Sequence, residues 1–454
     1  MYFVGCLRRL GYSYDNRYSV QANFRADAFD SSKLPASNRW GYFPSVSAGW
    51  TMSNESFIKD NVDKSVLSFL KLRGSWGRNG NVNILSGYPY TATISLNGQW
   101  YQYNPSTGAG DLTYGSGPTD MPNDKLKWET SEQLDFGIDA RLFSDRLSVT
   151  VDWYKKLTKD LLVSFAPVPE IGVKSTYANA GNVLNTGFEF ELGWKDSVGD
   201  FNYGINANFS TLHNEVLSLH SALDRITGGG ISGLNNKIRS AFEAGYPIWY
   251  FRGYKYAGVN TETGAPQYYD KDGNITESPQ DGDMQYIGKA IPDATYGLTL
   301  NLGYKGFDLV VFGTGTVGND IACLLYSADR SRTNSLTHFW NNSWKNPGDN
   351  TLYPKSATVA NDWAFWSSSA AIFDGSYFKI KQIQLGYTLP QKFTKKFLVN
   401  NFRVYASLDD FFTISNYPGC DPETATAGTG SSAGYDAGSY PTMKKVIFGV
   451  NITF

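Results

Sequence analysis

The sequence lacks the features that mark most helical membrane proteins, redox proteins and enzymes. No stretch of about 18 consecutive uncharged apolar residues occurs, which excludes a transmembrane helix. The only cysteines, Cys6, Cys323 and Cys420, are too far apart for a disulfide framework or a zinc motif. The three histidines form no pair with metal-ligand spacing, and the motifs of serine hydrolases, zinc proteases and phosphate-binding loops are missing. We therefore do not expect an enzyme.

Charged residues are also scarce. They make up 18% of the 454 residues, against about 25% in a typical soluble protein. The net charge is −2 and no run is rich in Lys and Arg, so we expect no nucleic-acid partner. The start, "MYFVGCLRRLGYSY", places its basic pair after the apolar run, which is the reverse of a signal peptide. We interpret it as an internal strand, either of a longer protein or of one that has lost its export signal.

What the sequence does contain is glycine, tyrosine and strict alternation. There are 46 glycines and 30 tyrosines. In the closing "KKVIFGVNITF", successive side chains of an extended strand point to opposite faces. Gly449, Asn451 and Thr453 fall on one face, and the other face is wholly apolar: Val446, Phe448, Val450, Ile452 and Phe454. We predict a final strand over residues 444–454.

The same alternation recurs in long segments such as "LDFGIDARLF", "GFEFELGWK" and "TYGLTLNLGYKG". About ten residues of a tilted strand span the apolar band of an outer membrane, which is about 25 Å tall. The pattern predicts an all-β protein, a transmembrane antiparallel β-barrel. A large soluble β-sandwich or β-helix is the alternative, but it favours shorter strands and more Lys and Glu on its polar face. In "YFKIKQIQLGY" the alternation changes phase around Lys381–Gln382, which indicates a β-bulge.

The connections between the predicted strands are of two kinds. Short turns are expected at 143–145, 195–200 and 305–308. Long polar loops are expected near 81–123, 220–245, 260–293, 321–375 and 416–441. Short turns at one end and long loops at the other are typical of an outer-membrane barrel. We expect one domain over residues 1–454 with about 14 strands, the first near residues 2–14.

Several longer motifs occur in a fixed order along almost the whole chain. They are "NRWGYFPSVSAGW", "LKLRGSWGRNGN", "LKWETSEQLDFGIDARLF", "NAGNVLNTGFEFEL", "KGFDLVVFGTGTVGN", "YFKIKQIQLGYTLP", "YPGCDPE" and "FGVNITF". With these motifs the chain resembles the C-terminal part of SusC/RagA-type TonB-dependent (TonB-linked) outer-membrane transporters of Bacteroidetes. One departure is Cys420 in "YPGCDPE", where that family more often carries a bulky or polar residue.

The resemblance implies a fold, a location and a set of partners. Such transporters have barrels of about 22 strands filled by an N-terminal plug, so this chain would supply about the last 14 strands without the plug. The implied location is the cell outer membrane of a Gram-negative, Bacteroidetes-like bacterium. The implied partners are a SusD-like surface lipoprotein, TonB–ExbB–ExbD acting through the missing plug, and the outer-membrane barrel assembly machinery. A final strand ending in Phe454 resembles the signal that this machinery reads.

Clustered aromatic residues in the predicted loops are candidates for ligand binding. Their flat apolar faces beside Asn, Asp and Ser can stack on sugar rings while the polar groups bind hydroxyls. The alternative is that they pack within the loops or belong to the aromatic girdle. The candidates are Trp100, Tyr101, Tyr103, Trp340, Trp344, Trp363, Phe365 and Trp366.

One acidic loop is a candidate cation site. The segment "YYDKDGNITESPQDGD" offers Asp270, Asp272 and Asn274 as oxygen ligands for Ca²⁺, but Gly273 comes too early for an EF-hand register. Solvated turn residues are the alternative, and no other cofactor is expected.

Three functions remain open. The first is TonB-dependent import of a bulky nutrient, most often an oligosaccharide and sometimes a peptide, under a SusD-like lid. The second is a passive outer-membrane porin, and the third is a soluble secreted carbohydrate-binding β-protein.

Overall fold

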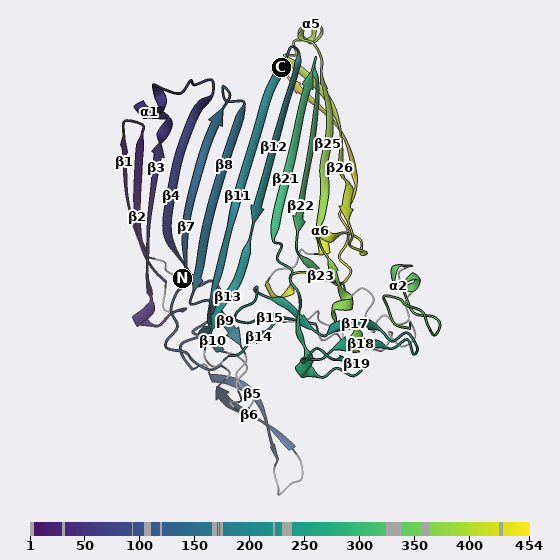
Figure 1. The fold of residues 1–454 in the computed structure, drawn as a ribbon. Helices are drawn as coiled ribbons and strands as arrows, with labels where there is room; N and C mark the ends of the chain where they lie inside the picture. The colour runs from purple at the N-terminus through teal and green to yellow at the C-terminus, as the bar shows by residue number, and fades with distance from the viewer. Residues whose placement is uncertain are drawn as a thin grey trace.

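The computed structural model describes most of the chain. The residues that it does not describe are 1–3, 30–31, 93, 104–109, 119, 166–169, 171, 173–175, 221–222, 229–237, 324–336, 356–362 and 426–429. Figure 1 shows long, nearly parallel-running ribbons at the top and a cluster of short elements at the bottom. None of the helices in the described part has the length and apolar character that crossing a bilayer requires.

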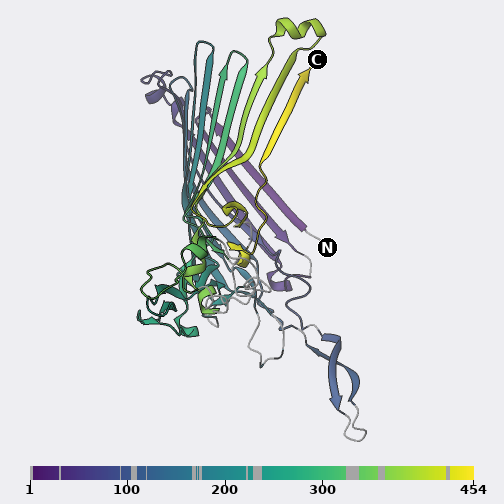
Figure 2. The same cartoon turned by 90° about the vertical axis from the view of Figure 1, so that its right-hand side faces the viewer.

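One antiparallel sheet of 14 strands forms the upper part of the molecule. Thirteen strands follow one another across the sheet, and the fourteenth, β13, continues β12 after Leu212 and pairs with the first half of β11. The sheet consists of β1 (Val4–Tyr14), β2 (Tyr18–Ala28), β3 (Trp40–Thr51), β4 (Leu67–Asn81), β7 (Glu129–Leu142), β8 (Leu147–Lys159), β11 (Gly181–Val198), β12 (Phe201–Thr211), β13 (His213–Leu219), β21 (Ala294–Tyr304), β22 (Phe307–Val317), β25 (Tyr377–Thr388), β26 (Asn401–Ser415) and β28 (Lys445–Thr453). Figure 2 shows that the sheet curves, with β1 and β28 as its two edges.

The two faces of this sheet differ in chemistry, as the alternation predicts. On β11, Phe188, Phe190 and Leu192 are 47%, 41% and 46% exposed on one face. Glu189 lies on the opposite face, where the register pairs it with Asp152 of β8. A continuous exposed apolar face is unfavourable in water but suits contact with lipid chains. The sheet therefore has an apolar outer wall and a polar inner wall.

The terminal strand has the same division. β28 pairs with β26 from Asn401↔Thr453 to Asp409↔Lys445. On its inner face, Gly449 leaves room for the ring of Tyr405, because a Cβ there would lie 2.2 Å from that ring. The apolar residues Val446, Phe448, Val450, Ile452 and Phe454 are all exposed.

The predicted bulge is confirmed. The register of β25 shifts between Ile380 and Gln382 relative to β26, and the register relative to β22 shifts at the same place. Relative to β22, Lys381 is the extra residue. Relative to β26, two residues, Asp410 and Phe411, lie opposite Lys381, and Asp410 has a positive φ of 59°. The phase change in the sequence thus marks a real distortion of the ladder, one that redirects the lysine side chain.

Short turns join strands at one end of the sheet, which we call the short-turn end. Lys305 and Gly306, between β21 and β22, both have positive φ, as a two-residue type I′ turn requires. A longer connection, residues 52–66, contains α1 (Ser56–Lys59) and is fixed by the buried Glu55. The carboxylate of Glu55 accepts hydrogen bonds from Arg17 and from the indole of Trp50. At the same end, α5 (Gln391–Thr394) and a 3-10 turn, η7 (Lys395–Phe397), join β25 to β26.

Long connections gather at the other end, which we call the long-loop end, and form small sheets of their own (Figure 1). The loop strands are β5 (Ile94–Tyr103), β6 (Gly110–Pro118), β9 (Leu162–Phe165), β10 (Thr176–Asn179), β14 (Ile226–Thr227), β15 (Arg239–Phe242), β16 (Tyr250–Gly253), β17 (Lys255–Val259), β18 (Pro266–Tyr269), β19 (Ile275–Thr276), β20 (Gln285–Gly288), β23 (Asp320–Cys323), β24 (Ile372–Asp374) and β27 (Tyr435–Asp436). In the described part of these loops, three short helices accompany them: α2 (Thr337–Asn341), α4 (Trp363–Trp366) and α6 (Pro422–Ala425).

Three of the long loops share an apolar core. It joins Ile238 and Phe251 of the β13–β21 connection, Phe339 and Phe365 of the β22–β25 connection, and Tyr435 of the β26–β28 connection. Segments almost two hundred residues apart in the chain therefore pack against one another. We call these three connections the loop cluster.

Candidate functional site

The inner wall of the sheet is lined by paired charges. Arg73 of β4 reaches across to two neighbouring strands, where its Nε donates to Asp139 at 3.1 Å and its terminal nitrogens lie 2.5 Å from Asp152 and 3.6 Å from Asp135. On the same wall, Lys159 of β8 lies 2.7 Å from Glu132 of β7. Such pairs keep the wall polar without leaving a single dominant sign of charge.

A cavity of about 1090 Å³ lies on this wall near the short-turn end. Its lining includes Ser148, Asn206 and Asn301, on three different strands. These side chains can donate and accept hydrogen bonds with a polar solute but offer no catalytic arrangement.

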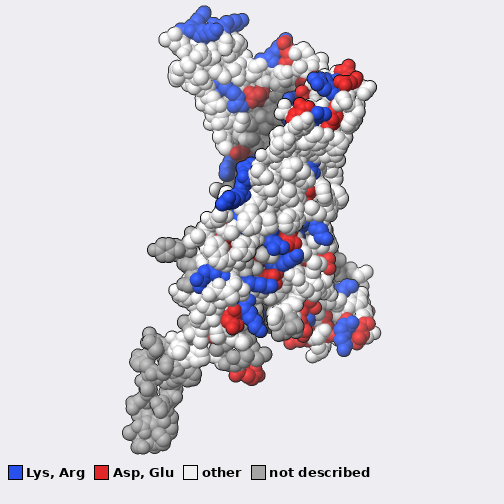
Figure 3. Space-filling view, turned by 90° about the vertical axis from the view of Figure 1, so that its left-hand side faces the viewer, with Lys and Arg blue, Asp and Glu red and all other residues white. Residues whose placement is uncertain are grey.

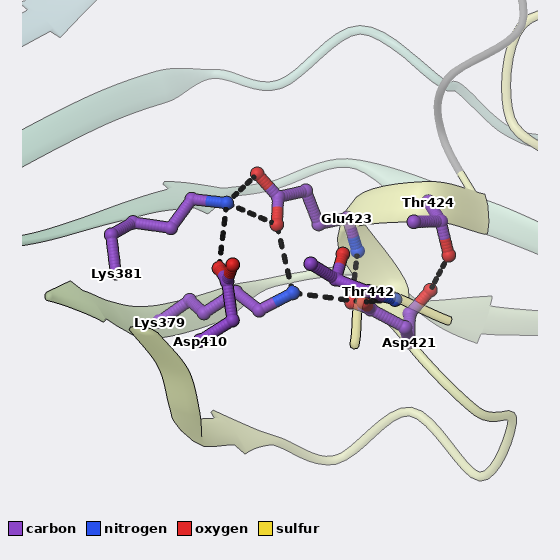
Figure 4. A network of polar contacts seen from close by, with 7 residues as sticks. All are labelled: Lys379, Lys381, Asp410, Asp421, Glu423, Thr424 and Thr442. Atoms are coloured by element: carbon purple, nitrogen blue, oxygen red, sulfur yellow. Dashed lines mark hydrogen bonds and ion pairs between the residues drawn. The ribbon is translucent and has the colours of Figure 1, made fainter. Parts of the chain in front are cut away.

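A second cluster ties one long loop to the inner wall (Figure 4). The Nζ of Lys379 lies 2.8 Å from Asp421 and 2.9 Å from Glu423. The Nζ of Lys381, at the bulge, lies 2.7 Å from Glu423 and 3.2 Å from Asp410. We call these five residues the Lys379 cluster. It joins β25 and β26 to the "YPGCDPE" segment at the start of the β26–β28 connection.

The Lys379 cluster is strongly buried at its centre. The side chain of Lys379 is 2% exposed and that of Asp421 is 6% exposed. The carboxylate of Asp421 also accepts hydrogen bonds from the backbone N–H groups of Glu423 and Thr442, at 3.1 and 3.0 Å. Burial raises the pKa of Asp421, but the hydrogen bonds from Lys379 and Thr442 outweigh it and leave the pKa below its usual value. Part of the sequence signal was available, since Lys381 lies at the phase change and Lys379 lies two residues before it. The partners Asp421 and Glu423, about 40 residues further along the chain, were not evident from the sequence.

The loop aromatics predicted to bind ligand divide into three groups. Trp344, Phe365 and Trp366 are buried, at 7%, 0% and 4% exposure. Phe365 contacts the ring of Tyr256 edge-on at 5.7 Å, and the indole of Trp344 donates to the carbonyl of Thr261 at 2.8 Å. In this structure these three side chains have no free face for a ligand, because they form the interior of the loop cluster. Their burial agrees with the packing alternative, and ligand binding by these residues stays a prediction.

Trp340 alone among the described candidates is open, at 57% exposure, with the Nζ of Lys345 5.4 Å from its ring. Trp100, Tyr101 and Tyr103 lie on β5, and Trp363 begins α4, but their side chains lie outside the described part of the chain.

The structure reveals an aromatic site that the sequence analysis missed. The rings of Tyr246 and Tyr286 stack at 6.0 Å with an interplanar angle of 19°, and Tyr250 stacks on Tyr246 at 4.7 Å. Tyr246 and Tyr286 are each 38% exposed and line a cavity of about 320 Å³. The cavity is also lined by polar side chains: His213, Asn214, Glu215, Lys289 and Asp293. We call it the tyrosine cavity.

The tyrosine cavity is assembled from three separate segments, which explains why it was missed. Tyr250 donates a hydrogen bond to Glu243 at 2.6 Å, and Arg225 donates to the same carboxylate at 2.7 Å. Burial and the hydrogen bond to Glu243 raise the pKa of Tyr250, so its hydroxyl stays protonated and continues to donate. The "GYPIWYF" segment was the available signal, because it places Tyr246 and Tyr250 in one short loop.

The candidate cation loop forms a turn closed by its own side chain. The carboxylate of Asp270 accepts from the backbone N–H groups of Asp272 and Asn274, both at 2.8 Å, and from the amide of Asn274 at 3.2 Å. These bonds lower the pKa of Asp270. Within the described residues no group of three or more His, Cys, Asp or Glu side chains could hold a metal ion. The turn is closed by its own hydrogen bonds, and a cation bound there stays a prediction.

Long antiparallel strands with an apolar outer wall, a polar inner wall and loops confined to one end define an outer-membrane β-barrel wall. The chain belongs to the family described as TonB dependent receptor-like, beta-barrel, whose sequence model matches residues 9–409. The short-turn end is therefore periplasmic and the long-loop end extracellular.

Comparison with individual proteins supports the same family assignment. The chain is 30% identical to TonB-dependent receptor P3 of Formosa agariphila, in an alignment that covers 99% of this chain and 45% of that protein. It is 31% identical to TonB-dependent receptor SusC of Bacteroides thetaiotaomicron, covering 99% of this chain and 44% of that protein. It is also similar to the solved structure of the RagAB peptide transporter, with a TM-score of 0.81, 25% identity and coverage of 100% of this chain and 47% of that one.

The chain spans less than half the length of these relatives. These relatives are named as receptors and transporters, which agrees with the expectation of a protein that is not an enzyme.

Proposed function

We propose that this chain forms the C-terminal barrel wall and extracellular loops of a protein that imports a bulky nutrient by TonB-dependent transport. The observation that carries the proposal is the polar, charge-paired inner wall, with ion pairs at Arg73 and Lys159 and, nearer the short-turn end, between Arg403 and Asp308. The long-loop end also carries a tyrosine-lined cavity. Family membership supports the energised mechanism.

An oligosaccharide is the substrate class that the tyrosine cavity favours. The exposed ring faces of Tyr246 and Tyr286 can stack on sugar rings, while Asn214, Glu215 and Asp293 can bind hydroxyl groups. The similar RagAB structure is described as a peptide transporter, which makes a peptide the competing class.

The partners follow from the family. A SusD-like lipoprotein would cover the extracellular loops, and TonB–ExbB–ExbD would act through a plug located elsewhere in the complete protein.

A passive porin is the second candidate, because the polar inner wall would also suit diffusion. Uptake that continues at the wild-type rate after removal of TonB would favour the porin and contradict the energised mechanism.

The decisive experiment uses the full-length protein together with its lipoprotein partner. Binding and uptake of a panel of glycans and peptides are compared between wild type and the double variant Y246A/Y286A. We expect glycan binding to weaken about tenfold, since each lost aromatic contact is worth about 0.5–1.5 kcal/mol. The matched control is Y440A, which removes another exposed tyrosine, 77% exposed, from a different long loop.

Unchanged glycan binding in Y246A/Y286A would remove the tyrosine cavity from the substrate path. If the double variant lost peptide binding but kept glycan binding, the proposed substrate class would change from oligosaccharide to peptide. Three predictions from the sequence also remain proposals. They are the stacking of ligand on Trp340, the binding of a cation near Asp270, and the assembly signal in the final strand.

A further inference from the structure

The turn between β25 and β26 carries an unusual concentration of positive charge. Residues 389–400, "LPQKFTKKFLVN", include Lys392, Lys395 and Lys396 and no acidic residue. All three lysines are exposed, and within the described residues no carboxylate lies within ion-pair distance of them. Figure 3 shows this group as the blue patch at the top of the molecule. We call residues 389–400 the lysine turn.

The lysine turn also exposes large apolar side chains. Phe393 is 53% exposed and Leu398 is 85% exposed. The Nζ of Lys392 lies 5.1 Å from the centre of the Phe393 ring. The turn is held by the buried Thr394, whose carbonyl accepts from the backbone N–H of Val399 at 3.2 Å. It therefore presents lysines and apolar groups together, as amphipathic segments at membrane surfaces do.

The position of the lysine turn relative to the membrane follows from the neighbouring aromatics. Tyr304 and Phe307, on either side of the adjacent turn, are 49% and 52% exposed. The ring of Phe307 lies 4.5 Å from that of Tyr387, which is one residue from the end of β25. Exposed Tyr and Phe at strand ends mark the level of the membrane–water interface. The lysine turn begins just beyond this level, where phospholipid headgroups lie.

The other long periplasmic turn, residues 52–66, does not share this excess of positive charge. Residues 52–66 contain Lys59 and Lys64, but these are interspersed with Glu55, Asp60 and Asp63. The two turns lie at the same end of the sheet and differ in their balance of charge.

We propose that the lysine turn is a binding site for anionic phospholipid headgroups of the periplasmic leaflet. Lys392, Lys395 and Lys396 neutralise the headgroup phosphates, and Phe393 and Leu398 enter the boundary with the acyl chains. Lipid fits both features at once, because a soluble anion would leave the apolar side chains in water. A periplasmic protein domain is the competing occupant.

The test measures lipid retained by the full-length, detergent-solubilised protein. Native mass spectrometry gives the affinity for phosphatidylglycerol, with phosphatidylcholine as the neutral probe. The variant K395Q/K396Q should lose up to about thirtyfold in affinity for phosphatidylglycerol, at about fivefold for each lysine near an anionic surface. The matched control K59Q/K64Q removes the same charge from the other turn and should retain wild-type affinity.

Ionic strength provides a second measurement that needs no variant. The Debye length falls from about 10 Å at 0.1 M salt to about 3 Å at 1 M, so phosphatidylglycerol retention by the wild type should fall over that range. Equal retention by K395Q/K396Q and wild type would overturn the proposal, as would equal loss in K59Q/K64Q. Reduced uptake by K395Q/K396Q with unchanged lipid affinity would also overturn it and assign the turn to a protein partner.

Discussion

Replacing Lys379 by Met should release the β26–β28 loop from the inner wall while the strands remain folded. The substitution keeps most of the side-chain volume but removes the cation that lies 2.8 Å from Asp421. Breaking a buried ion pair from one side costs about 3–5 kcal/mol, because the remaining charge is left without its counterion. Asp421 keeps its hydrogen bonds from Glu423 and Thr442, so we expect the lower end, about 3 kcal/mol.

Amide hydrogen exchange of the full-length protein measures this effect locally. A cost of about 3 kcal/mol corresponds to about a hundredfold loss of protection in peptides from residues 430–443. Lys381 is a matched comparison, since its side chain is 26% exposed and its pairs are partly solvated. K381M should therefore change protection by no more than about tenfold.

The double variant K379M/D421N separates a broken ion pair from lost packing. With both charges gone, most of the protection should return, because no buried charge is left without a partner. Wild-type protection in K379M would refute the reasoning, since it would mean that the buried pair does not hold the loop. A double variant that is less protected than K379M would show that Asp421 has another essential role.

Two further predictions concern the same wall. A methyl group at Gly449 would lie 2.2 Å from the ring of Tyr405, so G449A should lower the free energy of unfolding by about 1–2 kcal/mol. G11A, with open space around it, should leave it unchanged, and heat-modifiable gel mobility measures both variants. The pKa of Asp421 is lowered in the folded state, so its contribution to stability is complete above its ordinary value of 3.8 and is lost as the pH falls through the lower, folded value. Pepsin should cleave the β26–β28 loop increasingly over that acidic range, and a cleavage rate independent of pH would contradict the assignment.

The barrel wall was predictable from sequence because its physics is local. Each strand separates apolar from polar residues by simple alternation. The faces on which Phe188 and Glu189 lie can therefore be assigned from the strand's own sequence, without knowing which strands are its neighbours. The bulge at Lys381 was predictable for the same reason, since a bulge shifts the phase of the alternation.

The loop cluster was not predictable in this way. An exposed tryptophan and a buried one look the same in a polar loop, and the difference between Trp340 and Trp366 depends on segments distant in the chain. Phe365 is buried by Tyr256 and Tyr353, which come from different parts of two long loops. The tyrosine cavity escaped prediction because Tyr246 and Tyr286 meet only after the connection has folded back on itself.

The three long loops of the cluster are linked closely enough to respond together. The backbone N–H of Ala322 donates to the carbonyl of Gly434 at 2.8 Å, and the hydroxyl of Ser240 donates to the carbonyl of Ser431 at 2.7 Å. The ring of Tyr435 contacts Phe251 edge-on at 5.2 Å. Loosening the β26–β28 loop at Lys379 therefore removes support from both neighbouring loops, and the loss of exchange protection in K379M should extend to Ala322 in β23. Because the inner-wall pairs around Arg73 lie on other strands, they should keep their protection. The Lys379 cluster would then be one point at which the loop cluster is attached to the barrel.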